Sequence, residues 1–297
     1  MKIDVSVIII NYNTKEITLQ CINSVFQYTK SVSFEIILVD NNSTDGSRDF
    51  FSKDSRITYI YNPVNSGFGI ANNIGYQYAK GEYIFLLNSD TLLLNDAISI
   101  FYSKIQKLPQ NIGCLGTMLL DNNHKIGLSY GLFPTIWSSL LHLALCPIFH
   151  IDINFEKYFN YKGEPQDWFE VEYITGADLF LKRSIIEQHG LFDSRYFLYY
   201  EETDMQRRYA EAQIKRAIIQ GPQIIHLEAG SSKKTTPSLH KICYTYSSCF
   251  KFLKKWNSSF SYISFKILFF LTRGIHLLLN PKFTFKDKLE FLKLFSR

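Results

Sequence analysis

Clusters of Asn, Asp and Ser follow four apolar runs in the first third of the sequence, at Asn11, Asp40, Asn65 and Asp90. These side chains accept hydrogen bonds, and carboxylate oxygens are good ligands for Mg²⁺ and Mn²⁺. A fifth cluster, Glu201-Glu202-Thr203-Asp204, offers three carboxylates, and a carboxylate can act as a general base. Each cluster alone also fits a turn or the acidic first turn of a helix. Four clusters at the ends of successive runs favour a binding site.

The elements that must position these residues alternate between strand and helix patterns. Strands are predicted over residues 5–10, 35–39, 57–61 and 83–87, with a helix over 68–79. This alternation predicts an α/β fold with a mostly parallel sheet flanked by helices. Ligands of such sheets bind at the carboxyl ends of the strands, where the polar clusters stand.

The regular pattern weakens from residue 123 to 170, which we interpret as an insertion or an acceptor-side region. Order is predicted to return with a run over 171–181, helices over 182–189 and 201–212, and a strand over 214–219. A polar stretch after Gly230 indicates a boundary. We therefore predict two domains, residues 1–235 and a helical tail over 236–297.

Seven segments, in this order and spacing, resemble the inverting glycosyltransferases of family 2, which have the GT-A fold. They are VSVIIINYN, EIILVDNNSTDGS, NPVNSGFGIANNIG, GEYIFLLNSDT, ITGADLFLKRS, GLFDSRYFLYYEETDMQRR and IIHLEAGSS. The resemblance covers residues 3–232 and is nearest to rhamnosyltransferase-like bacterial enzymes that build cell-surface polysaccharides. It implies transfer from a UDP- or dTDP-linked sugar, such as rhamnose, galactose or galactofuranose, to a hydroxyl of a lipid-linked or cell-surface polysaccharide.

The resemblance also implies a divalent metal, Mn²⁺ or Mg²⁺, which would neutralise charge on the departing pyrophosphate. Asn88-Ser89-Asp90 stands where family members carry an Asp-x-Asp-like motif, so Asp90 is the implied anionic ligand. Asn88 can offer only a neutral oxygen. His226 resembles the His that completes the metal site in relatives, and an imidazole suits Mn²⁺ better than Mg²⁺. Without the resemblance, a lone His is more often an ordinary core or surface residue.

For the donor, the resemblance implies that Asp40 accepts a hydrogen bond from the N3–H of uracil or thymine. From the residues alone, Asp40 also fits an Asx turn or a helix N-cap. Asp178 has Lys182 as an alternative partner. The full set of expected donor-binding residues is Asn11, Asn13, Asp40, Asn42, Asn65, Gly67, Asn72, Asn88, Ser89, Gly176, Ala177 and Asp178.

Glu202 is the expected base that takes the proton of the acceptor hydroxyl, with Glu201 and Asp204 as alternatives. Relatives usually show Glu-Asp-x-Asp here, so Glu202 keeps the carboxylate on a stem one methylene longer. Asp204 could instead pair with Arg207 or Arg208, one helical turn further on.

The chain carries a net charge of +5, and much of its basic excess lies after residue 230. Residues 262–279 are apolar but include Lys266 and Arg273, which argues against a spanning helix. We expect an amphipathic helix on an anionic membrane surface, with a packing helix or a dimer contact as alternatives. The start, MKIDVSVIII, shows no signal-peptide pattern. These features predict a cytoplasmic protein, peripheral on the inner face of a bacterial membrane, without a nucleic-acid partner and with the oligomeric state left open.

The composition is 46% hydrophobic and 20% charged, which excludes a disordered chain. Five cysteines without CxxC spacing predict buried thiols. Two rival functions stay open. A nucleotidyltransferase would need a basic, Gly-rich loop after the first strand, where NYNTKE stands. The other rival is a sugar- or nucleotide-binding module without catalytic activity.

Overall fold

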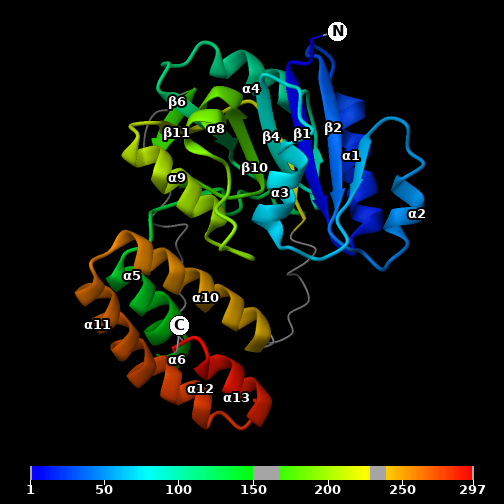
Figure 1. The fold of residues 1–297 in the computed structure, drawn as a ribbon. Helices are drawn as coiled ribbons and strands as arrows, with labels where there is room; N and C mark the ends of the chain where they lie inside the picture. The colour runs from blue at the N-terminus through cyan, green and yellow to red at the C-terminus, as the bar shows by residue number, and fades with distance from the viewer. Residues whose placement is uncertain (1, 150–166, 228–238, 296–297) are drawn as a thin grey trace. The chain divides into compact units, whose positions relative to one another are not determined.

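The computed structural model describes residues 2–149, 167–227 and 239–295, and Figure 1 shows their helices and strands. The chain divides into two compact units. The first comprises residues 1–132, 162–194 and 202–234, and the second comprises 133–161, 195–201 and 235–297. This division differs from the predicted boundary at residue 235, because two earlier segments also belong to the second unit.

The first unit is built on an eight-stranded sheet in the order β3-β2-β1-β4-β10-β6-β11-β8. The pairs of β1 with β2, β1 with β4, β2 with β3 and β6 with β11 are parallel, whereas β10 runs antiparallel to both of its neighbours. Long apolar runs make the inner strands, since both of their faces are covered. The strands are β1 (Val5–Asn11), β2 (Phe34–Asp40), β3 (Thr58–Tyr61), β4 (Tyr83–Asn88), β6 (Ile112–Thr117), β8 (Trp168–Val171), β10 (Asp178–Lys182) and β11 (Lys215–Ile219).

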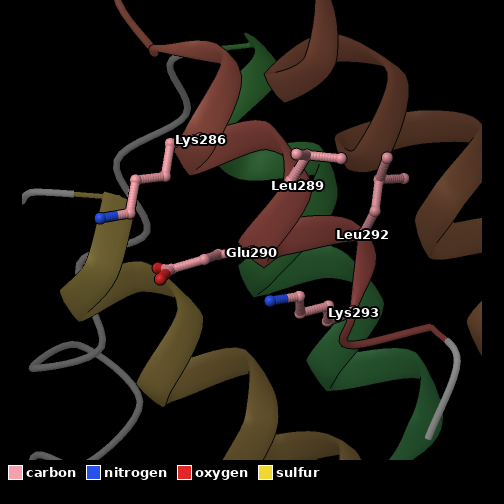
Figure 2. A pocket seen from close by; sticks show the side chains of 5 residues that line it. All are labelled: Lys286, Leu289, Glu290, Leu292 and Lys293. Carbon is pink, nitrogen blue, oxygen red and sulfur yellow. The ribbon is translucent and has the colours of Figure 1, made fainter.

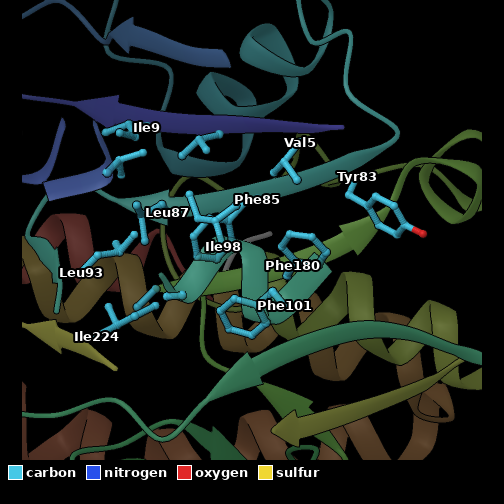
Figure 3. Close-up of a cluster of buried hydrophobic side chains, with 14 of the residues drawn as sticks. Val5, Ile9, Tyr83, Phe85, Leu87, Leu93, Ile98, Phe101, Phe180 and Ile224 are labelled. Atoms are coloured by element: carbon cyan, nitrogen blue, oxygen red, sulfur yellow. The ribbon is translucent and has the colours of Figure 1, made fainter. Parts of the chain in front are cut away.

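Helices cover both faces of this sheet, as the predicted α/β fold requires. One face packs on buried side chains of α1 (Lys15–Tyr28) and α4 (Ala97–Ile105). In this cluster, shown in Figure 3, the rings of Phe101 and Phe180 stack at 5.4 Å between centroids. The other face packs on α3 (Phe68–Tyr76), α8 (Arg183–His189) and α9 (Glu201–Glu211). A short helix, α2 (Ser47–Phe51), follows β2.

Two small antiparallel sheets join distant parts of this unit. In the first, β5 (Thr91–Leu93) pairs with β12 (Ile224–His226). In the second, β7 (Tyr130–Gly131) pairs with β9 (Tyr173–Ile174). The first of these pairs decides the geometry of the candidate site.

The second unit is helical and has its own apolar core of Phe, Tyr and Leu side chains. One of its helices runs through α5 (Ile136–Leu140), the π-helical turn η1 (Leu141–Leu145) and α6 (Cys146–Phe149). The others are α10 (Leu239–Trp256), the continuous α11–η2–α12 (Ser259–Phe269, Phe270–Gly274, Ile275–Leu279) and α13 (Phe285–Leu292). The cysteines of the chain are free thiols, and four of them are buried while Cys243 is partly exposed.

Two predictions about elements were wrong, and one central strand was missed. Residues 136–149 form a helix inside the stretch interpreted as irregular. The central strand β6 was not predicted. The run over 171–181 is not one element, since it is divided among the end of β8, β9 and β10.

Candidate active site

The carboxyl ends of three parallel strands bring the predicted polar residues together. In the sheet register, Asn11 at the end of β1 stands beside Asp40 at the end of β2. On the other side of β1, Ile10 stands beside Asn88 at the end of β4. The polar clusters therefore share one edge of the sheet, where ligands of α/β folds bind.

The amides after β1 stabilise the loops of this edge. The fully buried Asn11 accepts hydrogen bonds from the backbone and hydroxyl of Thr14 and donates to the Ser43 hydroxyl at 3.0 Å. Asn13 adopts a left-handed φ of 56° and accepts from the backbone N–H of Thr44 at 2.7 Å. Ser89, after β4, lies 3.4 Å from the Thr14 hydroxyl. These residues join the loops after β1, β2 and β4 into one network.

Asp40 stabilises the loop after β2 through its side chain. One carboxylate oxygen accepts from the backbone N–H of Ser43 at 2.8 Å, and the other accepts from the Tyr59 hydroxyl at 3.0 Å. The side chain is fully buried. Its neighbour Asn42 has a φ of 69° and accepts from the Tyr61 hydroxyl. Since both Asp40 oxygens hold protein donors, a contact of Asp40 with a nucleobase stays a prediction.

The segment before α3 is held by amides as well. Asn65 accepts hydrogen bonds from the Asn41 amide at 2.9 Å and from the backbone N–H of Gly67 at 3.1 Å. Gly67 has a φ of 86°, a conformation that strongly favours glycine, and α3 begins directly after it. Asn72 is buried and donates to the carbonyl of Phe68, one turn earlier in its own helix.

The side chains of Asn88, Asp90 and His226 meet although His226 lies far along the chain. The pairing of β5 with β12 places His226 opposite Thr91, next to Asp90. His226 Nε2 then lies 3.3 Å from Asp90 Oδ1 and 3.5 Å from the Asn88 amide nitrogen. The backbone N–H of Leu227 donates to the Asp90 carbonyl at 2.8 Å, which fixes this arrangement.

This group suits a divalent cation. Asn88 Oδ1 is buried and has no hydrogen-bond partner among the described residues, which is costly for an amide oxygen unless a cation or a donor binds there. A carboxylate, an amide oxygen and an imidazole nitrogen are all ligands of Mn²⁺ or Mg²⁺. Within the described ranges no cluster of three or more His, Cys, Asp or Glu side chains occurs, so such a site depends on the Asn88 amide.

Glu202, in the first turn of α9, is the acid beside the expected sugar position. A Cβ added to Gly176 would make ordinary contacts, 3.8 Å from Glu202 Cγ and 3.6 Å from the Phe68 ring, so Gly176 lies directly beside these two side chains. Burial raises the pKa of the Glu202 carboxyl above its usual range. A raised pKa brings a carboxylate closer to the basicity that general-base catalysis near neutral pH requires.

The other two acids of the cluster have different surroundings. Asp204 is fully buried, and its carboxylate lies 3.5 Å from Nε of Arg208, one turn further on. Arg208 also donates to the carbonyls of His189 and Leu191, so this pair anchors α9 to the loop after α8. Glu201 is buried as well. Two consecutive residues with left-handed φ, Tyr199 and Tyr200, precede it and set the start of the helix.

Gln206 is a positioning residue that we did not predict from the sequence. Its side chain accepts from the backbone N–H of Ile174 at 2.8 Å and donates to the carbonyl of the same residue at 2.7 Å. It also donates to the Glu202 carbonyl. Gln206 thereby fixes the turn carrying Glu202 to the strand that leads into Gly176. Its spacing of four residues from Glu202 was the available signal.

The segment Gly176-Ala177-Asp178 divides into an open and a buried part. The Ala177 carbonyl accepts from the backbone N–H of Asn88 at 3.0 Å. Asp178 is fully buried in β10, where its carboxyl accepts from the backbone N–H of Thr117 at 2.7 Å. Burial raises the pKa of Asp178 well above its usual value. The alternative partner Lys182 instead donates to the Gln110 carbonyl.

Comparison with known proteins gives a family match that includes most of the first unit and the segment 133–161 of the second. The profile of glycosyl transferase family 2 matches residues 6–189. Over 215 residues the chain is 23% identical to the N-acetylglucosaminyl-diphospho-decaprenol L-rhamnosyltransferase of Mycobacterium tuberculosis, covering 68% of this chain and 69% of that protein. Over 206 residues it is 26% identical to the low-salt glycan biosynthesis hexosyltransferase Agl10 of Haloferax volcanii, covering 68% and 60%.

A shorter match, 33% identical over 107 residues, links the chain to glycosyltransferase GlyG of Streptococcus pneumoniae, and it spans only 35% of either protein. Among solved structures, GalNAc-T7 with UDP, GalNAc and Mn²⁺ superposes with a TM-score of 0.61 at 16% identity. That superposition covers 98% of this chain and 54% of the other. It confirms the predicted GT-A-like fold. Because the family profile covers more than half of the sequence, the chain belongs to glycosyl transferase family 2.

Proposed function

We propose that this protein transfers a sugar from a UDP- or dTDP-linked donor to a hydroxyl of a saccharide acceptor, with inversion and with the help of a divalent metal. The observation that carries the proposal is the meeting of Asn88, Asp90 and His226 at the carboxyl edge of the sheet, with the Asn88 oxygen unpartnered. The family match favours transfer over the two rival functions.

At the donor end, Asp90, Asn88 and His226 would hold the cation. A cation there would stabilise the negative charge that develops on the departing diphosphate. This set contains one carboxylate, so it is less negative than the Asp-x-Asp-like arrangement of relatives. The imidazole favours Mn²⁺ over Mg²⁺.

At the acceptor end, Glu202 takes the proton of the acceptor hydroxyl. That oxygen forms a bond to the anomeric carbon while the bond from this carbon to the donor phosphate oxygen breaks. The nucleoside diphosphate leaves with the bonding electron pair, and attack from the opposite face inverts the configuration. The raised pKa of Glu202 and its position beside Gly176 support this role. Asp204 is less suited to it, because its carboxylate is fully buried against Arg208.

For the acceptor, the mycobacterial relative is named for a sugar carried on diphospho-decaprenol. By analogy we propose a lipid-linked or cell-surface saccharide as the acceptor of this protein. Reaction at the inner face of a bacterial cytoplasmic membrane follows from such an acceptor, because lipid-linked sugars stay in the bilayer. The sugar itself, rhamnose or galactose for example, is to be identified by a donor screen.

The metal step can be tested by measuring nucleoside diphosphate release from a panel of UDP- and dTDP-sugars, with Mn²⁺, with Mg²⁺ or with excess EDTA. We expect turnover only with metal, and a loss of roughly 10²-fold or more in Asp90→Ala with the fold retained. Asp49→Ala, at an exposed carboxylate on α2, is the matched control. Normal turnover of the wild type in EDTA, or of Asp90→Ala with metal, contradicts the proposal.

A further inference from the structure

The helix over residues 259–279 in the second unit has two apolar sides, and the described structure covers only one of them. Tyr262, Phe265 and Phe269 are buried in the core of this unit. The other side forms a stripe that includes Phe260, 82% exposed, and Leu279, 77% exposed. We call this set of exposed side chains the apolar stripe: Phe260, Ile263, Ile267, Leu271, Ile275 and Leu279.

The π-helical turn η2 keeps the apolar stripe on one face. From Ile263 to Leu279 its members are four residues apart, and each such step advances about 40° round an α-helix. In a regular α-helix the stripe would therefore drift towards the buried side. A π-helical turn holds more residues than an α-helical turn, so η2 offsets this drift between Ile267 and Ile275.

A second helix repeats the pattern. Trp137 is 73% exposed, and Leu141 and Phe149 on the same helix are exposed as well, at spacings of four and eight residues. This helix also contains a π-helical turn, η1, which contacts η2, and its first part, α5, contacts α11. Two neighbouring helices of the second unit thus each present exposed apolar side chains.

The cations within the long helix are turned away from the apolar stripe. Lys266 donates to the carbonyl of Phe295 at 2.9 Å, and Arg273 donates to the hydroxyl of Tyr246 at 3.1 Å. Both interactions are made with the body of the second unit. In the sequence, these two charges argue against a helix that spans a membrane. Because neither side chain lies on the apolar stripe, they do not oppose burial of the stripe in lipid.

The sequence around this helix is strongly basic. From residue 235 to 297 the sequence contains eleven Lys or Arg and two acids, which makes +9, against +5 for the whole chain. Lys254 before the helix and Lys282 after it are exposed. On α13, a shallow groove of about 400 Å³ is lined by two lysines, one acid and two leucines, which are Lys286, Lys293, Glu290, Leu289 and Leu292 (Figure 2).

We propose that the apolar stripe docks on an anionic lipid bilayer, with the helix lying along the interface and the surrounding lysines meeting lipid headgroups. By length and composition alone, residues 259–279 could cross a membrane. They lie along it instead, because their other side is part of the core of the second unit. A second copy of the chain is a poorer occupant, since two segments of +9 repel each other. Docking would bring the enzyme to the lipid-linked acceptor of the proposed function. The biological role of the docking surface therefore rests on that proposed function.

The test is flotation of the full-length protein with vesicles of phosphatidylcholine, alone or mixed with phosphatidylglycerol. We expect binding to the anionic vesicles and at least a ~10-fold weaker partition for the double variant Ile267→Glu, Leu271→Glu. Both side chains are exposed, so the core stays intact, whereas deleting the tail would remove buried Phe265 and Phe269. Ile126→Glu is the matched control, since Ile126 is 59% exposed in the first unit and Ile267 is 55% exposed.

Any of three flotation results overturns the proposal: no flotation of the wild type, equal flotation with neutral vesicles, or equal flotation of the double variant. A wild-type dimer that the double variant dissociates would assign the stripe to a second copy instead. The assay contains no donor or acceptor, so a failure here leaves the proposed sugar transfer standing. A failure of the metal test likewise leaves the membrane surface standing.

Discussion

Two carboxylates in one helical turn have different surroundings at the candidate active site. Asp204 points to Arg208 and helps to anchor α9, whereas Glu202 lies beside Gly176. The sequence could not separate them, because both are acids in the first turn of the same helix. The two carboxylates differ because only one side of α9 faces Ile174 and Gly176. Gln206 fixes this orientation through its two hydrogen bonds to Ile174.

Replacing Glu202 by Gln should lower kcat by roughly 10²–10⁴-fold, because the amide keeps the size of the side chain but cannot take a proton. Donor affinity, measured by calorimetry, should stay nearly unchanged. The base must be ionised, and burial raises its pKa, so kcat/KM should rise with pH through a value above the ~4.3 of an ordinary Glu. Glu202→Asp should keep measurable activity.

Glu201→Gln and Asp204→Asn are the comparisons for this experiment. Asp204→Asn should lower stability, because Arg208 would lose its buried anionic partner. If Glu202→Gln reacts at the wild-type rate while Glu201→Gln is inactive, the base is Glu201.

The proposed metal ligands could not be grouped from their spacing in the sequence. Asp90 and His226 were paired through resemblance to a family, since no local pattern links positions so far apart in the chain. The structure joins them through the two-stranded sheet of β5 and β12. The partnerless Asn88 oxygen is likewise visible only in the folded chain.

At the scale of elements, the apolar runs predicted the first four strands to within one or two residues. The strand β6 lacked such a signal, because its sequence IGCLGT contains two glycines. Close packing explains why both of these positions are glycine. A Cβ on Gly113 would lie 2.5 Å from the Ile214 side chain, and one on Gly116 would lie 2.4 Å from Ile174. The helix over 136–149 was missed because its exposed side is apolar too, which removes the contrast that marks a surface helix.

The strand β10 contains a titratable group that gives a prediction of stability. Folded Asp178 keeps its proton at pH values at which the unfolded chain, with a pKa of about 3.9, has lost it. Folding then takes up a proton, so the free energy of unfolding falls as pH rises from about 4 through the raised pKa. Asp178→Asn keeps an acceptor for the Thr117 N–H but has no proton to lose.

Thermal unfolding of wild type and Asp178→Asn between about pH 5 and about pH 8 measures this effect. The wild type should lose more stability over this range than the variant, and Asp49→Asn should behave like the wild type. Parallel curves for wild type and Asp178→Asn would show that Asp178 is ionised in the folded protein.

At the scale of the whole molecule, charge and chemistry are divided between the two units. The second unit holds the basic segment 235–297, and the other 234 residues of the chain, most of which belong to the first unit, carry a net negative charge. The chain passes from the second unit to the first between Glu201 and Glu202, directly before the proposed base. Within the second unit, residues 195–201 are held by stacking of Phe197 on Tyr244 and by the bond from the Ser248 hydroxyl to the Leu198 carbonyl. The start of α9 is thus joined by a short, well-packed segment to the unit proposed to dock on lipid.

This connection predicts that docking matters for the acceptor and not for the donor. The double variant Ile267→Glu, Leu271→Glu should transfer sugar to a water-soluble saccharide acceptor at the wild-type rate. Its transfer to the same saccharide carried on a polyprenyl diphosphate in anionic vesicles should fall by about the factor lost in flotation, ~10-fold or more. High salt should reduce the wild type's advantage on vesicles, because it screens the lysines from the headgroups. An equal loss of transfer rate with both acceptors would mean that the substitutions damage the active site. A wild-type rate with both acceptors would mean that the enzyme reaches its acceptor without the apolar stripe.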